Sequence, residues 1–323
     1  MATPGVGHDA APEISVVVPT FRRPHLLERM VAALEAQTLP PHCFDVIIVD
    51  NASPDDTTER LRALALSTPL RLRHLVEPRP GPAATRNTGW RASTAPLLAF
   101  VDDDCVPQPG WLAAGLQALT ADPDLGVVQG CTRKPEGGQL GDWTLWRQIT
   151  EPTPWFEGCN IFYRRAALEA AGGFDEEIRY YTEDTSLGWS VVAHGWRRGY
   201  AEGAVALHDV EERGLGYHLR TGLLERNVAR MAKRHPAFRD EAFWRPYAFR
   251  CEGATFALAL AGVLVARRSP LVGATLVLPY VRIRLPPAGH PRRGRFFLER
   301  VLVDAAQFAG MRWGSLQHRV LVV

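Results

Sequence analysis

Short apolar segments recur along the first hundred residues, and helical patterns fill the stretches between them. The segments are ISVVVPT (14–20), FDVIIVD (44–50), LRLRHLV (70–76) and PLLAFV (96–101). Apolar, β-branched runs of this length are typical of strands buried on both faces of a parallel sheet. Helices are expected to begin near Pro24 and Pro82, because proline suits the first helical position. The alternation predicts an α/β chain with a doubly wound, mostly parallel sheet and helices on both faces.

The pattern continues less regularly and then changes. A helix is expected from about Pro109, and strands are expected at LGVVQG (125–130) and at RRGYAEGAVALHD, which ends near His208. From residue 214 onward the chain is expected to be mainly helical. We therefore predict three regions, which are a flexible N-terminus (1–12), an α/β domain (13–210) and a mainly helical C-terminal region (211–323).

Polar side chains follow three of the predicted strands at the point where each strand ends. They are Thr20, the pair Asp50 and Asn51, and the run Asp102, Asp103 and Asp104. In doubly wound sheets, ligands bind outside the carboxyl ends of the strands. Adjacent carboxylates repel each other unless a cation or hydrogen-bond donors compensate them. The pattern predicts a mononucleotide pocket with a cation at this edge.

Two later features fit a cation at the same place. Glu183 and Asp184 open a predicted helix, and His208 ends a predicted strand. Two carboxylate groups and a histidine can hold Mg²⁺ or Mn²⁺, with phosphate oxygens completing the shell. Each feature also has a structural interpretation, as carboxylates favoured at a helix start or as a structural histidine. Arg22 and Arg23 are expected on the surface, with a chance of reaching phosphate.

Charge is distributed unevenly along the chain. Residues 1–209 hold 18 Lys and Arg against 27 Asp and Glu, whereas residues 210–323 hold 19 against 8. The balance changes from −9 to +11, which indicates different partners for the two parts. The acidic part suits a metal and neutral ligands. The basic part suits an anionic partner such as a phosphorylated carrier or a membrane surface, and it contains no recognisable nucleic-acid-binding module.

The apolar region 253–281 allows two interpretations. Arg267, Arg268 and Pro270 split it into stretches of about 12 residues, shorter than the ~20 residues of a membrane span. Core helices packed on the catalytic domain are preferred, because they suit this length. The alternative is interfacial helices on an anionic leaflet. The N-terminal residues lack a signal-peptide pattern, and the five cysteines show no C-x-x-C spacing. A cytoplasmic location is expected, with peripheral contact on the inner face of the membrane under the second interpretation.

Several ordered motifs carry a family resemblance. They are VVVPTFRR, VIIVDNAS, GPAATRNTG, LLAFVDDDCVPQPGWL, GCNIFYRRAALEAAGGFDE, YYTEDTSLGW and the terminal His208. Together, over about residues 13–210, they resemble the family-2 glycosyltransferases. The resemblance implies a GT-A fold and an inverting, metal-dependent transfer from a nucleotide-diphosphate sugar.

The resemblance also assigns roles to individual residues. Asp184 would be the general base, and Asp104 and His208 would hold the metal. The residues expected to contact the nucleotide sugar are Pro19, Thr20, Asp50, Asn51, Arg86, Asp102, Asp103, Gly158, Asn160 and Glu183. An aspartate at position 50 can accept a hydrogen bond from an imide N–H, which favours UDP, with GDP or dTDP as alternatives. The acceptor is a hydroxyl or amine on a small molecule, a carrier or a lipid. No Q-x-x-R-W element is evident, which favours single-sugar transfer, in cell-surface glycan or natural-product biosynthesis.

Other functions remain as alternatives. A nucleotidylyltransferase would need a Gly-rich loop after the first strand, and PTFRRPH is not one. An NAD-linked oxidoreductase would need G-x-G-x-x-G at the same place. A nucleotide-sugar-binding protein without turnover would not need the intact set of Asp104, Asp184 and His208.

Overall fold

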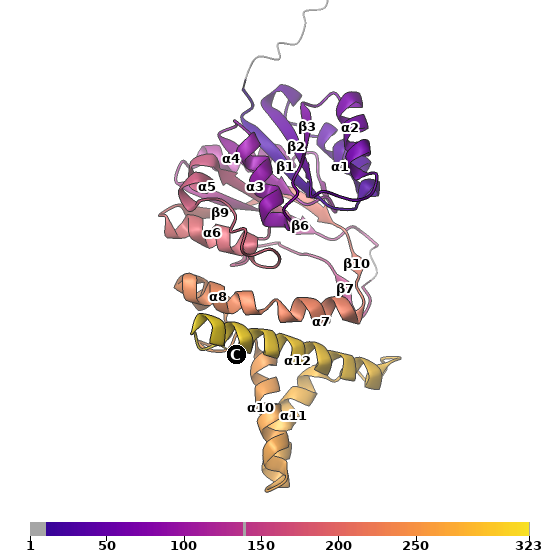
Figure 1. Ribbon diagram of the computed structural model, residues 1–323, viewed down its shortest axis with the longest axis vertical. Coiled ribbons are helices and arrows are strands. Elements are labelled where there is room, and N and C mark those ends of the chain that lie inside the picture. Colours follow the sequence, from indigo (N-terminus) through magenta and orange to yellow (C-terminus); the bar gives the residue numbers. More distant parts are fainter. Residues whose placement is uncertain (1–10, 138–139, 323) are drawn as a thin grey trace, which may run out of the picture. The chain divides into compact units, whose positions relative to one another are not determined.

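The structure, a computed structural model, describes residues 11–137 and 140–322 (Figure 1). The chain divides into two compact units. Unit 1 comprises Met1–Gly138 and Trp146–Val210, and unit 2 comprises Gln139–Leu145 and Glu211–Val323. The flexible N-terminus predicted over residues 1–12 lies almost entirely outside the described residues.

Unit 1 is built on one eight-stranded sheet. In sheet order its strands are β3 (Leu72–Val76), β2 (Phe44–Asp50), β1 (Ile14–Thr20), β4 (Leu97–Val101), β8 (Asn160–Arg164), β6 (Leu125–Arg133), β9 (Arg197–His208) and β5 (Cys105–Pro107). The first four strands are parallel, and β6 is parallel to β9. Strand β8 runs antiparallel to both of its neighbours, and β5 runs antiparallel to β9. A parallel half, as predicted, therefore continues into a mixed half.

Helices cover both faces of this sheet, which explains the uninterrupted apolar strands. Val16 and Val18 lie in one core cluster with Leu27 and Met30 of α1. Val17 points to the opposite face, where α3 packs on β1 and β2. The helices of unit 1 are α1 (Pro24–Glu35), η1 (Pro41–Cys43), α2 (Thr57–Ser67), α3 (Pro82–Ala92), α4 (Trp111–Ala121), α5 (Arg165–Ala171) and α6 (Glu183–Ala193). The predicted helix starts at Pro24 and Pro82 are confirmed.

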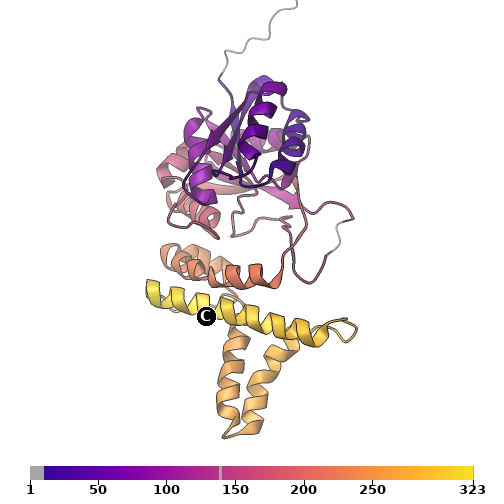
Figure 2. The same cartoon turned by 45° about the vertical axis from the view of Figure 1, so that its right-hand side comes forward.

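Unit 2 is mainly helical, as predicted. Its helices are α7 (Leu215–Leu223), α8 (Arg226–Arg234), α9 (Pro236–Ala242), α10 (Cys251–Ala266), α11 (Pro270–Arg284) and α12 (Arg293–His318). Helix α12 lies along α7 and α8, and α10 pairs with α11 as a helical hairpin (Figure 2). A short antiparallel pair joins β7 (Thr144–Leu145) to β10 (Glu211–Glu212). Among the described residues, none of the helices combines the length and apolarity that crossing a membrane requires.

Candidate functional site

The acidic run lies at the carboxyl end of β4, beside the end of β1. The hydroxyl of Thr20 donates a hydrogen bond to Asp103 Oδ2 at 2.7 Å. Arg23 Nη1 donates to Asp103 Oδ1 at 2.8 Å and to Asp104 Oδ2 at 2.7 Å. Burial and the charge of Asp104 raise the pKa of Asp103 to about 6, although Arg23 and Thr20 oppose the shift. Arg23 was expected on the surface, and instead it neutralises part of the acidic run.

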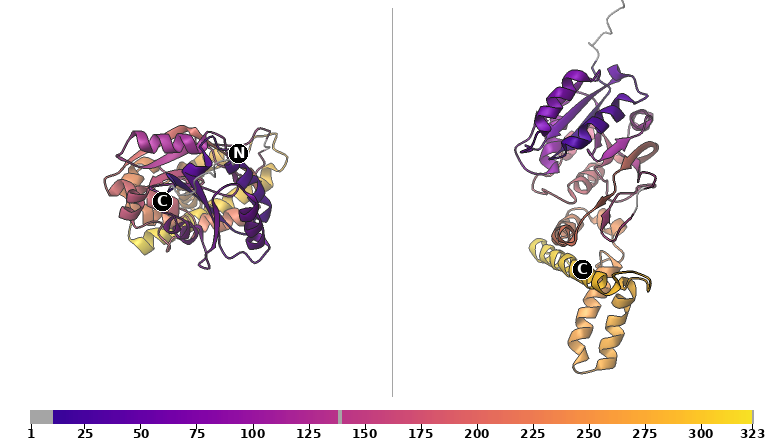
Figure 3. Two further views of the ribbon diagram at one scale, coloured as in Figure 1. Left: turned by 90° about the horizontal axis from the view of Figure 1, so that it is seen from above. Right: turned by 90° about the vertical axis from the view of Figure 1, so that its right-hand side faces the viewer.

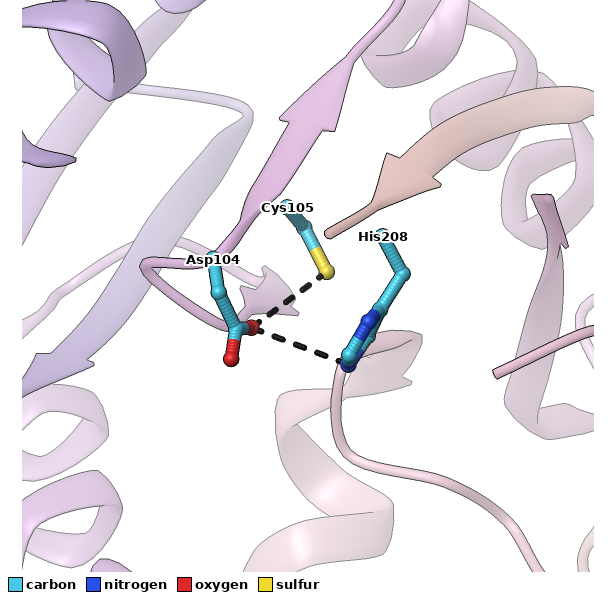
Figure 4. A group of neighbouring side chains, drawn as sticks. All are labelled: Asp104, Cys105 and His208. Carbon is cyan, nitrogen blue, oxygen red and sulfur yellow. Dashed lines mark hydrogen bonds and ion pairs between the residues drawn. The ribbon is translucent and has the colours of Figure 1, made fainter. Parts of the chain in front are cut away.

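Asp104, Cys105 and His208 form a second cluster (Figure 4). Cys105 and His208 are direct partners across the antiparallel β5–β9 pair, so their side chains share one face. Asp104 Oδ1 lies 3.7 Å from His208 Nε2 and 3.9 Å from Cys105 Sγ. Three ligand atoms, one from each side chain, lie within 4.8 Å of one another. The structure thus brings together the two metal ligands predicted from the sequence, and it adds Cys105, which the sequence analysis missed.

The imidazole orientation shows why a cation suits this cluster. His208 Nδ1 lies 2.7 Å from the carbonyl oxygen of Asp209, and a carbonyl can only accept a hydrogen bond. Nδ1 therefore carries the hydrogen, and in a neutral ring the lone pair of Nε2 faces Asp104 Oδ1. A lone pair and a carboxylate oxygen repel each other unless a proton or a cation lies between them. Backbone-oriented histidines of this kind are typical of metal sites, so the residues fit a divalent cation.

One buried arginine connects the two acidic motifs. Arg86 is 4% exposed, and its Nη2 donates to Asp102 Oδ1 at 2.7 Å while its Nη1 donates to Glu183 Oε1 at 2.9 Å. Among the described residues, its Nε has no hydrogen-bond partner. Burial and the adjacent Asp184 charge raise the pKa of Glu183 to about 7 against the opposing effect of Arg86. Asp102 of the first motif and Glu183 of the second therefore lie within reach of one guanidinium group.

Asp184 lies at the start of α6 and is held by backbone amides. The N–H of Gly158 donates to Oδ2 at 2.8 Å, and the N–H of Thr185 donates to Oδ1 at 2.7 Å. A Cβ at position 158 would approach Arg86 Nη2 to 2.9 Å, so this glycine lets the 158 amide lie beside the buried arginine. Tyr181 and Thr182 have φ of 66° and 76° just before the helix. The turn and the two amides together fix the half-buried carboxylate in position.

Other predicted nucleotide-sugar residues are used by the protein itself. Asp50 is fully buried and accepts hydrogen bonds from Ser53 and Thr58. Asn51 donates to the carbonyl oxygens of Glu77 and Arg79 and accepts from the Gly81 amide.

Asn160, which was expected to line the sugar pocket, is also used for contacts within the protein. Asn160 is fully buried, where Nδ2 donates to the carbonyl oxygens of Cys131 and Ala204 and Oδ1 accepts from the Trp111 indole. Pro19 is buried within β1. These placements give Asp50, Asn51 and Asn160 scaffold contacts, whereas Asp102, Asp104, Asp184 and His208 border the acidic site.

The family comparison covers most of this unit. The model of glycosyl transferase family 2 matches residues 15–174. Residues 15–174 belong to glycosyl transferase family 2. This family-2 domain includes the acidic run and Arg86, whereas Glu183, Asp184 and His208 follow the matched residues.

The relatives by sequence include named glycosyltransferases. Validoxylamine A glucosyltransferase of Streptomyces hygroscopicus subsp. limoneus is 28% identical over 271 residues, covering 72% of this chain and 59% of that protein. Pre-mycofactocin glycosyltransferase of Mycobacterium tuberculosis (strain H37Rv) is 28% identical over 239 residues, covering 69% of this chain and 48% of that protein. The chain thus spans about half to three fifths of the length of these relatives.

Solved structures confirm the GT-A fold predicted from the sequence. The mannosyltransferase PcManGT from Pyrobaculum calidifontis superposes with a TM-score of 0.69 at 24% identity, covering 94% of this chain and 88% of that chain. TarS of S. aureus superposes with a TM-score of 0.51 at 17% identity, covering 95% of this chain and 92% of that chain. The similarity to PcManGT and TarS extends over nearly the whole chain and concerns the fold.

Proposed function

We propose that this chain is a metal-dependent inverting glycosyltransferase that moves one sugar from a nucleotide-diphosphate sugar to a hydroxyl or amine acceptor. The observation that carries the proposal is the buried Arg86, which contacts Asp102 of the acidic run and Glu183 beside Asp184. A single guanidinium therefore joins a candidate cation site to a candidate general base. An inverting transfer needs one group for the leaving diphosphate and one base for the acceptor proton.

Asp184 is the proposed base. Oδ1 accepts hydrogen bonds from the amide and the hydroxyl of Thr185, whereas Oδ2 accepts one from the Gly158 amide and keeps a further lone pair for an acceptor proton. A direct attack on the anomeric carbon needs only one such base and no second carboxylic acid for the leaving group, unlike a glycosidase pair. Glu183 has a different role, because its carboxylate is already bound to Arg86 inside the protein.

Asp104 and His208 are the proposed ligands of Mg²⁺ or Mn²⁺, and such an ion stabilises negative charge on a departing diphosphate. Asp102 lies beside them and is proposed to contact the ribose or a water on the metal. Arg23 holds Asp104 Oδ2 and leaves Oδ1 facing His208. The two oxygens of Asp104 are thus divided between an arginine and the cation site.

The donor is proposed to be a UDP, GDP or dTDP sugar. PcManGT was solved with GDP-Man and Mn²⁺, and TarS was solved with UDP, so related folds accept both uracil and guanine nucleotides. The full burial of Asp50 removes the argument that favoured UDP. We propose that unit 2, with its excess of basic residues, contributes peripheral contact with a membrane surface and contacts to an acceptor that is small, carrier-bound or lipid-linked.

Calorimetry tests this proposal. UDP and GDP should bind the full chain much more tightly with Mn²⁺ or Mg²⁺ than with a chelator, and Asp104→Ala should abolish that difference. Asp124→Ala removes an exposed carboxylate from the same unit and serves as the matched control. Nucleotide binding of equal strength with and without metal would overturn the role of Asp104. A panel of nucleotide sugars then identifies the donor.

A further inference from the structure

Helices α10 and α11 form a hairpin (Figure 3), and small residues lie in the contact between them. A Cβ at Gly262 would come within 2.8 Å of the Gly273 carbonyl oxygen, and a Cβ at Gly273 would come within 2.6 Å of the Ala266 Cβ. The two backbones therefore approach closely at these glycines, and Phe256 of α10 packs against Tyr280 of α11 with ring centroids 5.3 Å apart.

Many other large apolar side chains of the two helices point outward. Leu264 is 77% exposed and Leu271 is 83% exposed. The other large apolar residues exposed along the two helices are Leu258, Leu260, Val263, Val265, Val272, Leu278 and Ile283. Only Phe256, Ala259 and Gly262 are buried in α10, and only Gly273 and Tyr280 in α11. Core helices, as predicted, fit only the part of the hairpin beside α12, where Phe256, Ala259 and Tyr280 lie in one core cluster. The rest of the hairpin exposes its large apolar side chains.

The exposed surface of the two helices is mostly apolar. Residues 253–266 of α10 and residues 269–281 around α11 contain no charged residue. Val263, Leu264 and Val265 are consecutive, and each helical residue turns the side chain by about 100°. A helix lying flat in the membrane interface needs an apolar face opposite a polar one. A helix that is apolar all round belongs in a protein core or in a membrane, which favours insertion of the hairpin over helices that lie flat in the interface.

Polar and aromatic residues mark the two ends of the apolar part. Trp244 and Tyr247 are more than half exposed just before α10, and Arg282 is exposed near the end of α11. Tryptophan and tyrosine are enriched at membrane interfaces, and basic residues are enriched on the cytoplasmic side. Residues 211–323 share the +11 charge of the C-terminal part, which is attracted to anionic lipid. A protein partner would have to enclose the hairpin from all sides, as lipid does without a shaped groove.

We infer that the α10–α11 hairpin enters the hydrocarbon layer of an anionic membrane, with both of its ends on one side. Residues 253–266 are about 21 Å long as a helix, against about 30 Å for the hydrocarbon layer. The hairpin therefore enters the layer without crossing it, and Arg267 and Arg268 at the turn draw water and headgroups toward them through local thinning of the bilayer. An enzyme held this way acts on an acceptor in the same membrane, which makes the acceptor lipid-linked; this last step rests on the proposed function, whereas the insertion does not.

Vesicle flotation of the full chain tests the insertion. The protein should float with neutral phosphatidylcholine vesicles and with vesicles that also contain phosphatidylglycerol, and it should remain bound at about 1 M salt, where charge attraction is screened. The double variant Leu264→Glu/Leu271→Glu should lower the bound fraction about tenfold or more, because charges are disfavoured in hydrocarbon. Leu66→Glu changes a side chain that is 90% exposed on α2, and it should float like the wild type.

Circular dichroism and melting of each variant without lipid show that the substitutions, which are at exposed positions, leave the fold intact. Flotation only with anionic vesicles at low salt would reduce the contact to surface attraction and overturn the inference. A lipid-free dimer that the double variant dissociates would show that a second copy covers the hairpin, and would also overturn it. Neither result affects metal-dependent nucleotide binding, so this inference and the proposed function fail separately.

Discussion

Strand β1 and helix α10 are both apolar, but β1 is buried and much of α10 is exposed. Every residue of β1 is buried, because helices from the same unit cover both faces of its sheet. In α10, Leu264 is 77% exposed, and among the described residues the atoms nearest to a Cβ at the neighbouring Gly262 all belong to α11. Apolar composition therefore predicts that an element is buried against something. It does not say whether other residues of the same chain bury it.

The two units also differ in how they handle charge. Unit 1 buries Asp103, Glu183 and Arg86. Glu183 pairs with Arg86, and Asp103 accepts hydrogen bonds from Thr20 and Arg23. Such burial disfavours ionised carboxylates unless cations compensate them. The hairpin of unit 2 instead keeps charges out of its apolar part and places Arg267 and Arg268 at its turn. Unit 1 thus contains buried charged groups that contact one another, whereas the apolar part of the hairpin contains no charged residue.

The largest expected effect compares a covered apolar side chain with an exposed one. Phe162 is fully buried in β8, and its ring centroid lies 5.1 Å from that of Trp111. Phe162→Ala should lower the free energy of unfolding by about 3–5 kcal/mol, since it leaves a cavity. Leu264→Ala should change it by less than about 0.5 kcal/mol without lipid. Urea unfolding of both variants measures the difference, and similar losses would mean that the hairpin is covered in solution.

The sequence predicted the parallel half of the sheet well because its strands are local signals. Strands β1 and β2 begin and end at the residues expected from their apolar runs. Strand β5 was missed because it has three residues and is stabilised by pairing with β9, about a hundred residues later. The outward-facing hairpin was missed for the same kind of reason, since exposure depends on which distant residues pack against a helix.

The candidate site was predictable in its residue types and less so in its contacts. Asp104 and His208 were expected together and lie together. Arg23 was assigned to the surface because a charged residue after a strand has no local pattern that indicates a buried partner. The scaffold contacts of Asn160 join it to β6, α4 and β9. No sequence spacing encodes these contacts. The roles of Asp184, Asn160 and the other site residues in the reaction stay predictions.

The second prediction concerns the proposed base in the acidic unit. Asp184→Asn keeps the size of the side chain but removes the proton acceptor, so turnover should fall about 10²-fold or more, the usual worth of a general base. Metal-dependent nucleotide binding should stay close to that of the wild type. Asp124→Asn is the control, because Asp124 is an exposed acid in the same unit. Near wild-type turnover in Asp184→Asn would remove it from the mechanism.

The third prediction tests the buried charge of Glu183 through pH. Burial raises its pKa to about 7 from an ordinary value of 4.5, so the folded protein binds this proton more tightly than the unfolded chain does. The stabilisation of the folded state that comes from this proton is fully present below pH 4.5 and is lost as pH rises through about 7. Glu183→Gln should flatten the fall in unfolding free energy over this window by roughly 2 kcal/mol. Urea unfolding with a chelator at several pH values measures it, and parallel curves for the two proteins would contradict it.

The smallest expected effect concerns Cys105, the sulfur atom beside the proposed cation site. A contact with the Cys159 thiol, together with burial, raises the pKa of the Cys105 thiol, so a hard ion such as Mn²⁺ should leave it protonated. Co²⁺ and Zn²⁺ accept sulfur more readily, and Cys105 Sγ lies 3.9 Å from Asp104 Oδ1. Cys105→Ser should weaken Co²⁺ binding about tenfold and change Mn²⁺ binding little.

Calorimetry gives both affinities, and the sulfur-to-cobalt absorption band reports the bond directly. Asp104→Ala is the comparison, because it should weaken both ions alike. A cobalt complex of the wild type without that band would mean that Cys105 keeps its contact with Cys159. The Cys105 thiol would then be part of the buried apolar packing of unit 1. Asp104 would belong to the cation site, and its neighbour Cys105 would not.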